Sequence, residues 1–290
     1  MGWLIWAVRI LPALFLLFCF LTAPNLIHRK LNFRQLTGWD YAHRGLYNNG
    51  RGIPENSLPA FSAAVREGYG IELDVRLTAD RVPVIHHDDT LERTCGDTRR
   101  VDETVLNDIR SLKLFGTQCT VPTFDEVLEL VNGQVPLIIE LKTDSRKRNL
   151  EELVYERLQK YPGVYCMESF DPFAVQWFKH NAPDVIRGQL SFMDTLKGKS
   201  FREAVKRILL GCLLVNCFSR PDFIAYGFKT DANIAYRFVS NVFRPLLAAW
   251  TVQDAESSRK LREEYDIQIF ENFRPGQAYK VRETDRRKEK

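Results

Sequence analysis

The stretch Gly70-Ile71-Glu72-Leu73-Asp74-Val75 alternates apolar residues with two acidic ones. Side chains two positions apart on a strand point to the same face, so Glu72 and Asp74 share one face. Residues 137–142 read Leu-Ile-Ile-Glu-Leu-Lys and carry Glu140 and Lys142 at the same spacing. Helical patterns follow both runs, and helices are expected to cover the outer face of such strands. The sequence therefore predicts that these carboxylates face inward from neighbouring buried strands.

Similar apolar runs recur along the chain, separated by longer helical patterns. We expect eight strands, at residues 39–43, 71–75, 137–141, 164–168, 185–190, 222–226, 247–252 and 267–270. This alternation over roughly 250 residues is typical of a (β/α)8 TIM barrel, although a doubly wound open sheet has the same alternation. Polar residues such as His43, Glu72 and Glu140 fall at strand ends, where a barrel places its active site. They favour the barrel.

The length of one connection predicts a further feature of the domain. Residues 76–119 are too long for a simple link between strands, so we expect a small insertion after the second strand. The barrel domain is expected at residues 39–290, after a linker at residues 28–38.

The amino terminus is much more apolar than the rest of the chain. From Trp3 to Ile27 the only charged residue is Arg9. Roughly 20 apolar residues span a bilayer core, so we predict a transmembrane anchor at residues 1–27, with a secretory signal as the alternative. Arg29 and Lys30 follow this segment and predict a single-pass membrane protein whose catalytic domain lies on the cytoplasmic side.

Charge and cysteine content exclude some classes of protein. A net charge of +4, without a basic stripe interleaved with aromatic residues, argues against a nucleic-acid partner. Apart from Cys19 in the apolar segment, the cysteines are odd in number and irregularly spaced, which indicates reduced thiols. No Cys-x-x-Cys motif supports a structural zinc site.

Two histidines are candidates for chemistry. The run of residues 41–45, Tyr-Ala-His-Arg-Gly, places His43 and Arg44 at the end of a strand. Histidine transfers protons near neutral pH, and the planar fork of arginine suits phosphate oxygens. Residues 76–87 read as a strand, a turn and a returning strand. If the turn centres near Ala79-Asp80, the return brings His87 opposite Glu72.

The carboxylates indicate a metal site. Glu72, Asp74 and Glu140 would repel one another inside a barrel unless a cation lay between them. Donors that are all oxygen suit Mg²⁺ or Ca²⁺ better than Zn²⁺. Internal salt bridges are the alternative interpretation. Two histidines beside a divalent cation and an arginine form a constellation that can cleave a phosphodiester.

Several motifs, taken together, resemble the glycerophosphodiester phosphodiesterase family, within the phosphatidylinositol phospholipase C-like phosphodiesterase superfamily. They occur in order and with matching spacing, and later motifs extend the resemblance to about residue 275. The motifs are His43-Arg44-Gly45, Pro54-Glu55-Asn56, Glu72-Leu73-Asp74-Val75, His87-Asp88, Arg93-Thr94, Glu140-Leu141-Lys142, Ser169-Phe170 and Trp250-Thr251-Val252.

The resemblance implies a barrel enzyme that hydrolyses glycerophosphodiesters to glycerol 3-phosphate and an alcohol, with a divalent cation, Mg²⁺ or Ca²⁺, as cofactor. It also implies a role for each matching residue. His43 and His87 would be the acid–base pair, Glu72, Asp74 and Glu140 the metal ligands, Arg44 and Lys142 the phosphate contacts, and Glu55 and Asp88 supporting residues.

The chain departs from the family pattern at two places. Gln253 stands where the family has Asn, and residues 271–275, Glu-Asn-Phe-Arg-Pro, replace the usual Thr-Asp-x-Pro. We expect neither departure to touch the metal and histidine residues, and both to alter the substrate pocket. The alternative substrates are membrane lysophospholipids, cleaved by lysophospholipase D activity. An alternative of another class is a non-catalytic, membrane-linked barrel used as a binding module.

Overall fold

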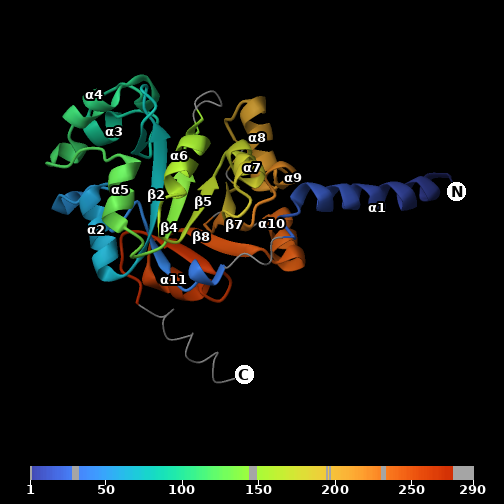
Figure 1. The fold of residues 1–290 in the computed structure, drawn as a ribbon. Coiled ribbons are helices and arrows are strands. Elements are labelled where there is room, and N and C mark those ends of the chain that lie inside the picture. Colours follow the sequence, from blue (N-terminus) through green and yellow to red (C-terminus); the bar gives the residue numbers. More distant parts are fainter. Residues whose placement is uncertain are drawn as a thin grey trace.

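The computed structural model describes residues 2–27, 33–143, 149–193, 195, 197–229 and 233–276. Its centre is a closed barrel of eight parallel strands, shown in Figure 1. Strand β1 (Asp40–His43) pairs with both β2 (Gly70–Leu77) and β9 (Ile267–Phe270), which closes the sheet. Between β2 and β9 lie β4 (Leu137–Leu141), β5 (Tyr165–Ser169), β6 (Arg187–Ser191), β7 (Phe223–Gly227) and β8 (Leu246–Val252). The barrel, not the open sheet, is confirmed.

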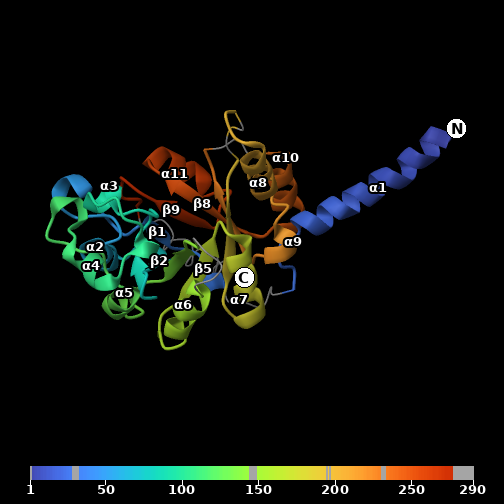
Figure 2. The ribbon, with the colours of Figure 1, turned by 90° about the horizontal axis from the view of Figure 1, so that it is seen from above.

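Helices surround the barrel, as the two views of the ribbon show (Figures 1 and 2). The α-helices are α2 (Leu58–Glu67), α5 (Phe124–Val131), α6 (Leu150–Leu158), α7 (Pro172–Asn181), α8 (Phe201–Gly211), α9 (Asn216–Ser219), α10 (Ile234–Phe238) and α11 (Ala255–Leu261). Short helical turns are η1 (Phe33–Gln35), η2 (Asn49–Arg51) and η5 (Val239–Phe243). Local sequence sets their ends: Thr123 and Glu126 form a capping box at the start of α5.

Packing of the helices on the barrel decides which residues of β2 face inward. Ile71, Leu73 and Val75 belong to the buried cluster that β2 shares with helix residues such as Phe61 of α2 and Val127 of α5. Successive side chains on a strand alternate between faces, so the residues between these three point into the barrel. The apolar positions thereby hold the acidic positions at the barrel centre.

The segment after β2 forms a small lobe beside the barrel. Strand β3 (Pro83–Ile85) returns antiparallel to β2. It is followed by α3 (Glu92–Cys95), η3 (Val101–Glu103), α4 (Leu106–Ser111) and η4 (Leu114–Gly116). The lobe has a core of its own, formed by Val84, Leu91, Val101, Ile109, Leu114 and Val121.

Helix α1 (Gly2–Thr22) extends away from the barrel (Figures 1 and 2). Its carboxyl end is fixed to the barrel: the rings of Phe18 and Phe238 lie 5.2 Å apart, and Asn216 Nδ2 donates to the Thr22 carbonyl at 2.8 Å. Across the described ranges, no helix is long and apolar enough to cross a membrane.

The prediction of a transmembrane anchor at residues 1–27, and with it the single-pass location and cytoplasmic orientation, is therefore wrong. Arg29 and Lys30, on which the orientation depended, lie outside the described residues, as do residues 28–32 of the linker and residues 277–290.

Candidate active site

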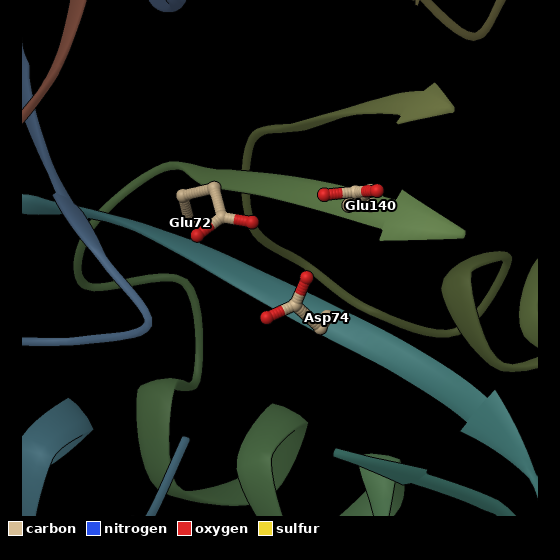
Figure 3. A group of neighbouring side chains, drawn as sticks. All are labelled: Glu72, Asp74 and Glu140. Atoms are coloured by element: carbon tan, nitrogen blue, oxygen red, sulfur yellow. The ribbon is translucent and has the colours of Figure 1, made fainter. Parts of the chain in front are cut away.

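Three buried carboxylates converge inside the barrel, as Figure 3 shows. Glu72 and Asp74 extend from β2 and Glu140 from the neighbouring β4, and one oxygen of each lies within 4.8 Å of the others. Parallel pairing sets Asp74 beside Glu140, so adjacent strands deliver the two side chains to the same level. All three side chains are buried. The structure thus brings together the residues expected to bind metal.

The electrostatics of this group show excess negative charge. Burial, together with repulsion from Asp74, raises the pKa of Glu72 well above its usual value. Burial raises the pKa of Glu140 to about 7, although Lys142 opposes the shift. The Nζ atom of Lys142 lies 2.7 Å from Glu140 Oε1 and 3.1 Å from Asp74 Oδ1. Arg44 also lies near Asp74 but is shared with Glu55, so the two cations do not neutralise the carboxylates, and the site favours a further cation.

A fourth buried carboxylate lies on β5, the strand next to β4. Glu168 of β5 pairs in register with Glu140, is 1% exposed, and has an Oε2 atom without a hydrogen-bond partner. Glu168 is the last residue of the strand expected at residues 164–168, and no role was expected for it. A buried set of oxygen donors with an unpartnered carboxylate oxygen fits a hard divalent cation such as Mg²⁺ or Ca²⁺. The residues present therefore fit the predicted cofactor.

His43 lies at the end of β1, at the edge of the carboxylate group. Its Nε2 atom is 3.9 Å from Glu72 Oε2. Its other nitrogen, Nδ1, lies 2.8 Å from Glu271 Oε2, after the last strand. The ring is thus held between a predicted metal ligand and a carboxylate that the sequence analysis did not include in the site.

His87 reaches the site from the lobe, with a register that differs from the prediction. Val75 pairs with Ile85, and the His86 amide donates to the Asp74 carbonyl at 3.0 Å. The turn therefore centres on Asp80, and the predicted pairing of His87 with Glu72 is wrong by one residue. His87, and not the adjacent His86, was expected at the site. Both ring nitrogens of His86 form hydrogen bonds within the lobe, to the Asp88 carbonyl and to Thr94 Oγ1, so the geometry agrees with that choice.

The environment of His87 keeps its ring neutral near pH 7. Burial lowers the pKa of His87 to about 4, although the charge of Asp74 opposes the shift. Its Nδ1 atom lies 2.6 Å from Asp88 Oδ1. Each candidate histidine therefore has a carboxylate at Nδ1: His43 has Glu271, and His87 has Asp88.

Two arginines connect the supporting carboxylates. Arg44 Nη1 donates to Glu55 Oε1 at 2.7 Å, and Arg44 Nε lies 3.4 Å from Asp74 Oδ2. Arg93 donates to Glu55 Oε1 at 2.7 Å and to Asp88 Oδ2 at 2.6 Å. The predicted supports Glu55 and Asp88 are thus joined through Arg93. Sequence reasoning assigned Arg93 no role, although the Arg93-Thr94 motif was part of the family resemblance.

One of the two departures from the family pattern, at Glu271, contacts His43 directly, so the expectation that neither would touch the histidine residues is wrong there; the described contacts of Gln253 are with Glu271 and Lys229. Glu271 accepts hydrogen bonds from Tyr47 Oη at 3.0 Å and from Gln253 Nε2 at 2.5 Å, besides contacting His43. Lys229 in turn donates to Gln253. Pairing of β1 with β9 produces this contact, and a barrel closure of this kind is not visible in local sequence patterns.

A closed parallel barrel whose strand ends carry histidines, arginines and a buried carboxylate group defines an enzyme of the TIM-barrel class. Residues 43–267 match the glycerophosphoryl diester phosphodiesterase family, and the chain belongs to that family. It is therefore a phosphoric diester hydrolase.

Individual proteins are also similar to this chain in sequence. Over 240 residues the chain is 27% identical to YhdW of Bacillus subtilis (strain 168), covering 76% of this chain and 88% of that protein. It is 32% identical over 160 residues to the glycerophosphodiester phosphodiesterase of Caldanaerobacter subterraneus subsp. tengcongensis, covering 51% of this chain and 65% of that one.

The fold is similar to that of solved structures. An Oleispira antarctica phosphodiesterase, solved in complex with its product sn-glycerol-3-phosphate, superposes with a TM-score of 0.66 at 22% identity. The similarity covers 86% of this chain and 97% of that one.

The Glu271 carboxylate gives a prediction for acid stability. Burial raises its pKa, but the contacts with His43, Gln253 and Tyr47 outweigh burial and lower it to about 2. A carboxylate whose pKa is lowered on folding stabilises the fold above its unfolded pKa, near 4.3, and loses this contribution as pH falls toward 2. We expect Glu271→Gln to lower the free energy of unfolding by on the order of 1 kcal/mol at pH 6 and by less at pH 3.

Urea unfolding of both proteins at the two pH values measures this difference. An equal loss at pH 6 and pH 3 would contradict the assigned ionisation of Glu271.

Proposed function

We propose that this chain hydrolyses glycerophosphodiesters to glycerol 3-phosphate and an alcohol, in a reaction that depends on a divalent cation and two histidines. One observation carries the proposal: His43 and His87 come from different elements to a site that also holds the buried carboxylates Glu72, Asp74 and Glu140. Together they supply what phosphodiester hydrolysis needs, namely proton transfer at both ends of the reacting bond and neutralisation of phosphate charge.

The carboxylates Glu72, Asp74 and Glu140 would hold Mg²⁺ or Ca²⁺. A bound divalent cation supplies Lewis-acid stabilisation of the phosphoryl oxygens. Arg44 forms ion pairs with Glu55 and Asp74, and Lys142 forms ion pairs with Asp74 and Glu140. Both cationic side chains would turn toward the anionic substrate when it binds. Their long side chains allow this shift without movement of the strands.

The two histidines would share the proton transfers. One takes the proton from the attacking water, and the other protonates the departing alkoxide, so that the P–O bond to the alcohol breaks as the bond to water forms. Each ring has a carboxylate at Nδ1, which directs its Nε2 toward the reacting oxygens. Retention of both histidines and all three carboxylates argues against the alternative of a non-catalytic binding module.

Product analysis tests this reaction. We would incubate purified protein with glycerophosphocholine and either Mg²⁺ or Ca²⁺ and follow phosphorus-containing products by ³¹P NMR. The proposal expects glycerol 3-phosphate, with choline as the alcohol. The proposal would be contradicted if the end product were phosphocholine or a cyclic phosphate. It would also be contradicted if neither cation supported turnover.

A specific observation supports lysophospholipids as a second substrate class. Phe170 and Phe192 follow β5 and β6, and Trp250 lies in β8; their rings make edge-on contacts with centroids 5.6–6.0 Å apart. Lys142 Nζ lies 6.0 Å from the ring of Phe170, which connects this aromatic cluster to the phosphate-binding residues. Apolar rings beside a phosphate site suit a substrate that carries an acyl chain.

We expect Phe192→Ala to lower kcat/KM for lysophosphatidylcholine about 10-fold more than for glycerophosphocholine, because only the first substrate has apolar surface to bury. Phe173→Ala is the matched control: Phe173 is 41% exposed on α7, where its ring stacks on Phe218. An equal effect of Phe192→Ala on both substrates, or no turnover of the lysophospholipid by the wild-type protein, would remove support for this second class.

A further inference from the structure

We propose that Glu271 is a positioning residue for His43, which holds Nδ1 as a hydrogen-bond donor so that Nε2 is the nitrogen that exchanges protons with substrate. This inference rests on the proposed function, because it assigns His43 a proton-transfer role. The contact that suggests it is the 2.8 Å distance between His43 Nδ1 and Glu271 Oε2. Glu271 is the first residue of the segment 271–275, in which this chain departs from the Thr-Asp-x-Pro pattern of the family.

The partners of Glu271 determine its state. Tyr47 Oη donates to Oε2 at 3.0 Å, and Gln253 Nε2 donates to Oε1 at 2.5 Å. Both carboxylate oxygens therefore accept hydrogen bonds, which is the arrangement of an ionised carboxylate, a group with no proton to donate. Since Glu271 can only accept, the proton between it and His43 must reside on Nδ1.

The tautomer of the ring follows from this proton. A neutral imidazole carries a single N–H, so a proton on Nδ1 leaves Nε2 with its lone pair. Nε2 is also the nitrogen that faces the metal-binding carboxylates, 3.9 Å from Glu72 Oε2. Glu271 therefore fixes both the orientation of the ring and the nitrogen that is available for chemistry.

The network around Glu271 is itself anchored on several strands and loops. Lys229, after β7, donates to Gln253, which follows β8. Gln253 then holds Glu271, after β9, against His43 at the end of β1. The side chain of Glu271 is 13% exposed, which limits competition from water. Residues that follow three successive strands, β7, β8 and β9, thus support the imidazole ring that β1 carries.

Kinetics of Glu271→Gln test the proposal. The amide keeps the size of the side chain but can present its NH₂ group to Nδ1, which favours the other tautomer. We expect kcat for glycerophosphocholine to fall by on the order of 100-fold with KM within about threefold, as expected when support to a catalytic histidine is lost. Glu271→Asp, which restores the carboxylate, should recover part of kcat.

A matched control separates positioning from general destabilisation. Glu67, the last residue of α2, is another carboxylate in an ion pair; it pairs with Arg274, three residues after Glu271, and makes no described contact with either candidate histidine. Glu67→Gln should leave kcat within about twofold of wild type. An unchanged kcat in folded Glu271→Gln, or an equal loss in the control, would overturn the proposal.

A spectroscopic readout is independent of turnover. With ¹⁵N-labelled histidine, two-bond ¹H–¹⁵N correlations distinguish the two neutral tautomers, and loss of a signal set in His43→Ala assigns the ring. We expect His43 in the wild-type protein to carry its proton on Nδ1 and to lose this preference in Glu271→Gln. A wild-type ring protonated on Nε2 would overturn the proposal. If the protein proved inactive on phosphodiesters, the proposed function would fail while this measurement still reported on the tautomer.

Discussion

His43→Ala should lower kcat for glycerophosphocholine hydrolysis by about 1,000-fold, because removal of a positioned proton-transfer group typically costs 10² to 10⁴ in rate. KM should change little, since the ring does not lie among the residues expected to bind phosphate charge. His87→Ala should have an effect of similar size. The measurement is steady-state hydrolysis with excess cation, with folding checked by circular dichroism.

The double variant sharpens this expectation. If the histidines act in one proton-transfer sequence, His43→Ala/His87→Ala should be hardly slower than either single variant, because groups that act as a unit are not additive. His180→Ala is the control, since His180 is an exposed histidine at the end of α7. Single variants that retain more than about a tenth of wild-type kcat would show that the mechanism does not use these rings.

The second large effect concerns the metal site. Glu72→Gln should lower kcat by on the order of 1,000-fold, since loss of cation stabilisation removes several kcal/mol at the transition state. Chelation of the wild-type protein should have the same effect, reversed by added Mg²⁺ or Ca²⁺. Isothermal titration calorimetry should show weaker binding of the activating cation by the variant.

Stability distinguishes a cation site from internal salt bridges. The pKa of Glu72 is raised by burial and by repulsion from Asp74, Glu140 and Glu168, so an amide at this position relieves repulsion. The backbone N–H of Arg44 that now donates to Glu72 Oε2 can donate to the amide oxygen instead. Glu72→Gln should therefore be at least as stable as wild type without metal, and less stabilised by added cation. A clear loss of metal-free stability would favour the salt-bridge interpretation.

Much of the barrel was predictable because its determinants are local. The apolar runs predicted all eight barrel strands within a few residues, and Leu137–Leu141 and Ile267–Phe270 match the structure at both ends. The inward direction of Glu72 and Asp74 followed from a period of two on a strand covered by helices. These features depend on neighbouring residues in the chain and on one general rule of packing.

The features that were not predicted depend on contacts between residues far apart in the sequence. The register between β2 and β3 is set by a turn centred on Asp80, and a shift of one residue in a turn has no clear signature in sequence. Arg93 and Glu271 gain their roles only when the lobe folds back and the barrel closes. The apolar composition of the amino terminus predicted a membrane span, whereas the structure presents a helix whose carboxyl end is packed against Phe238 and Asn216.

The closure of β1 against β9 has a consequence for synthesis of the protein. His43 emerges early from the ribosome, but the carboxylate that holds its ring lies 228 residues further along the chain. During translation the first strand has no partner on one side until Ile267–Phe270 has left the exit tunnel. A nascent chain is therefore unable to assemble the complete histidine site, and hydrolytic competence arises only when synthesis of the barrel is almost finished.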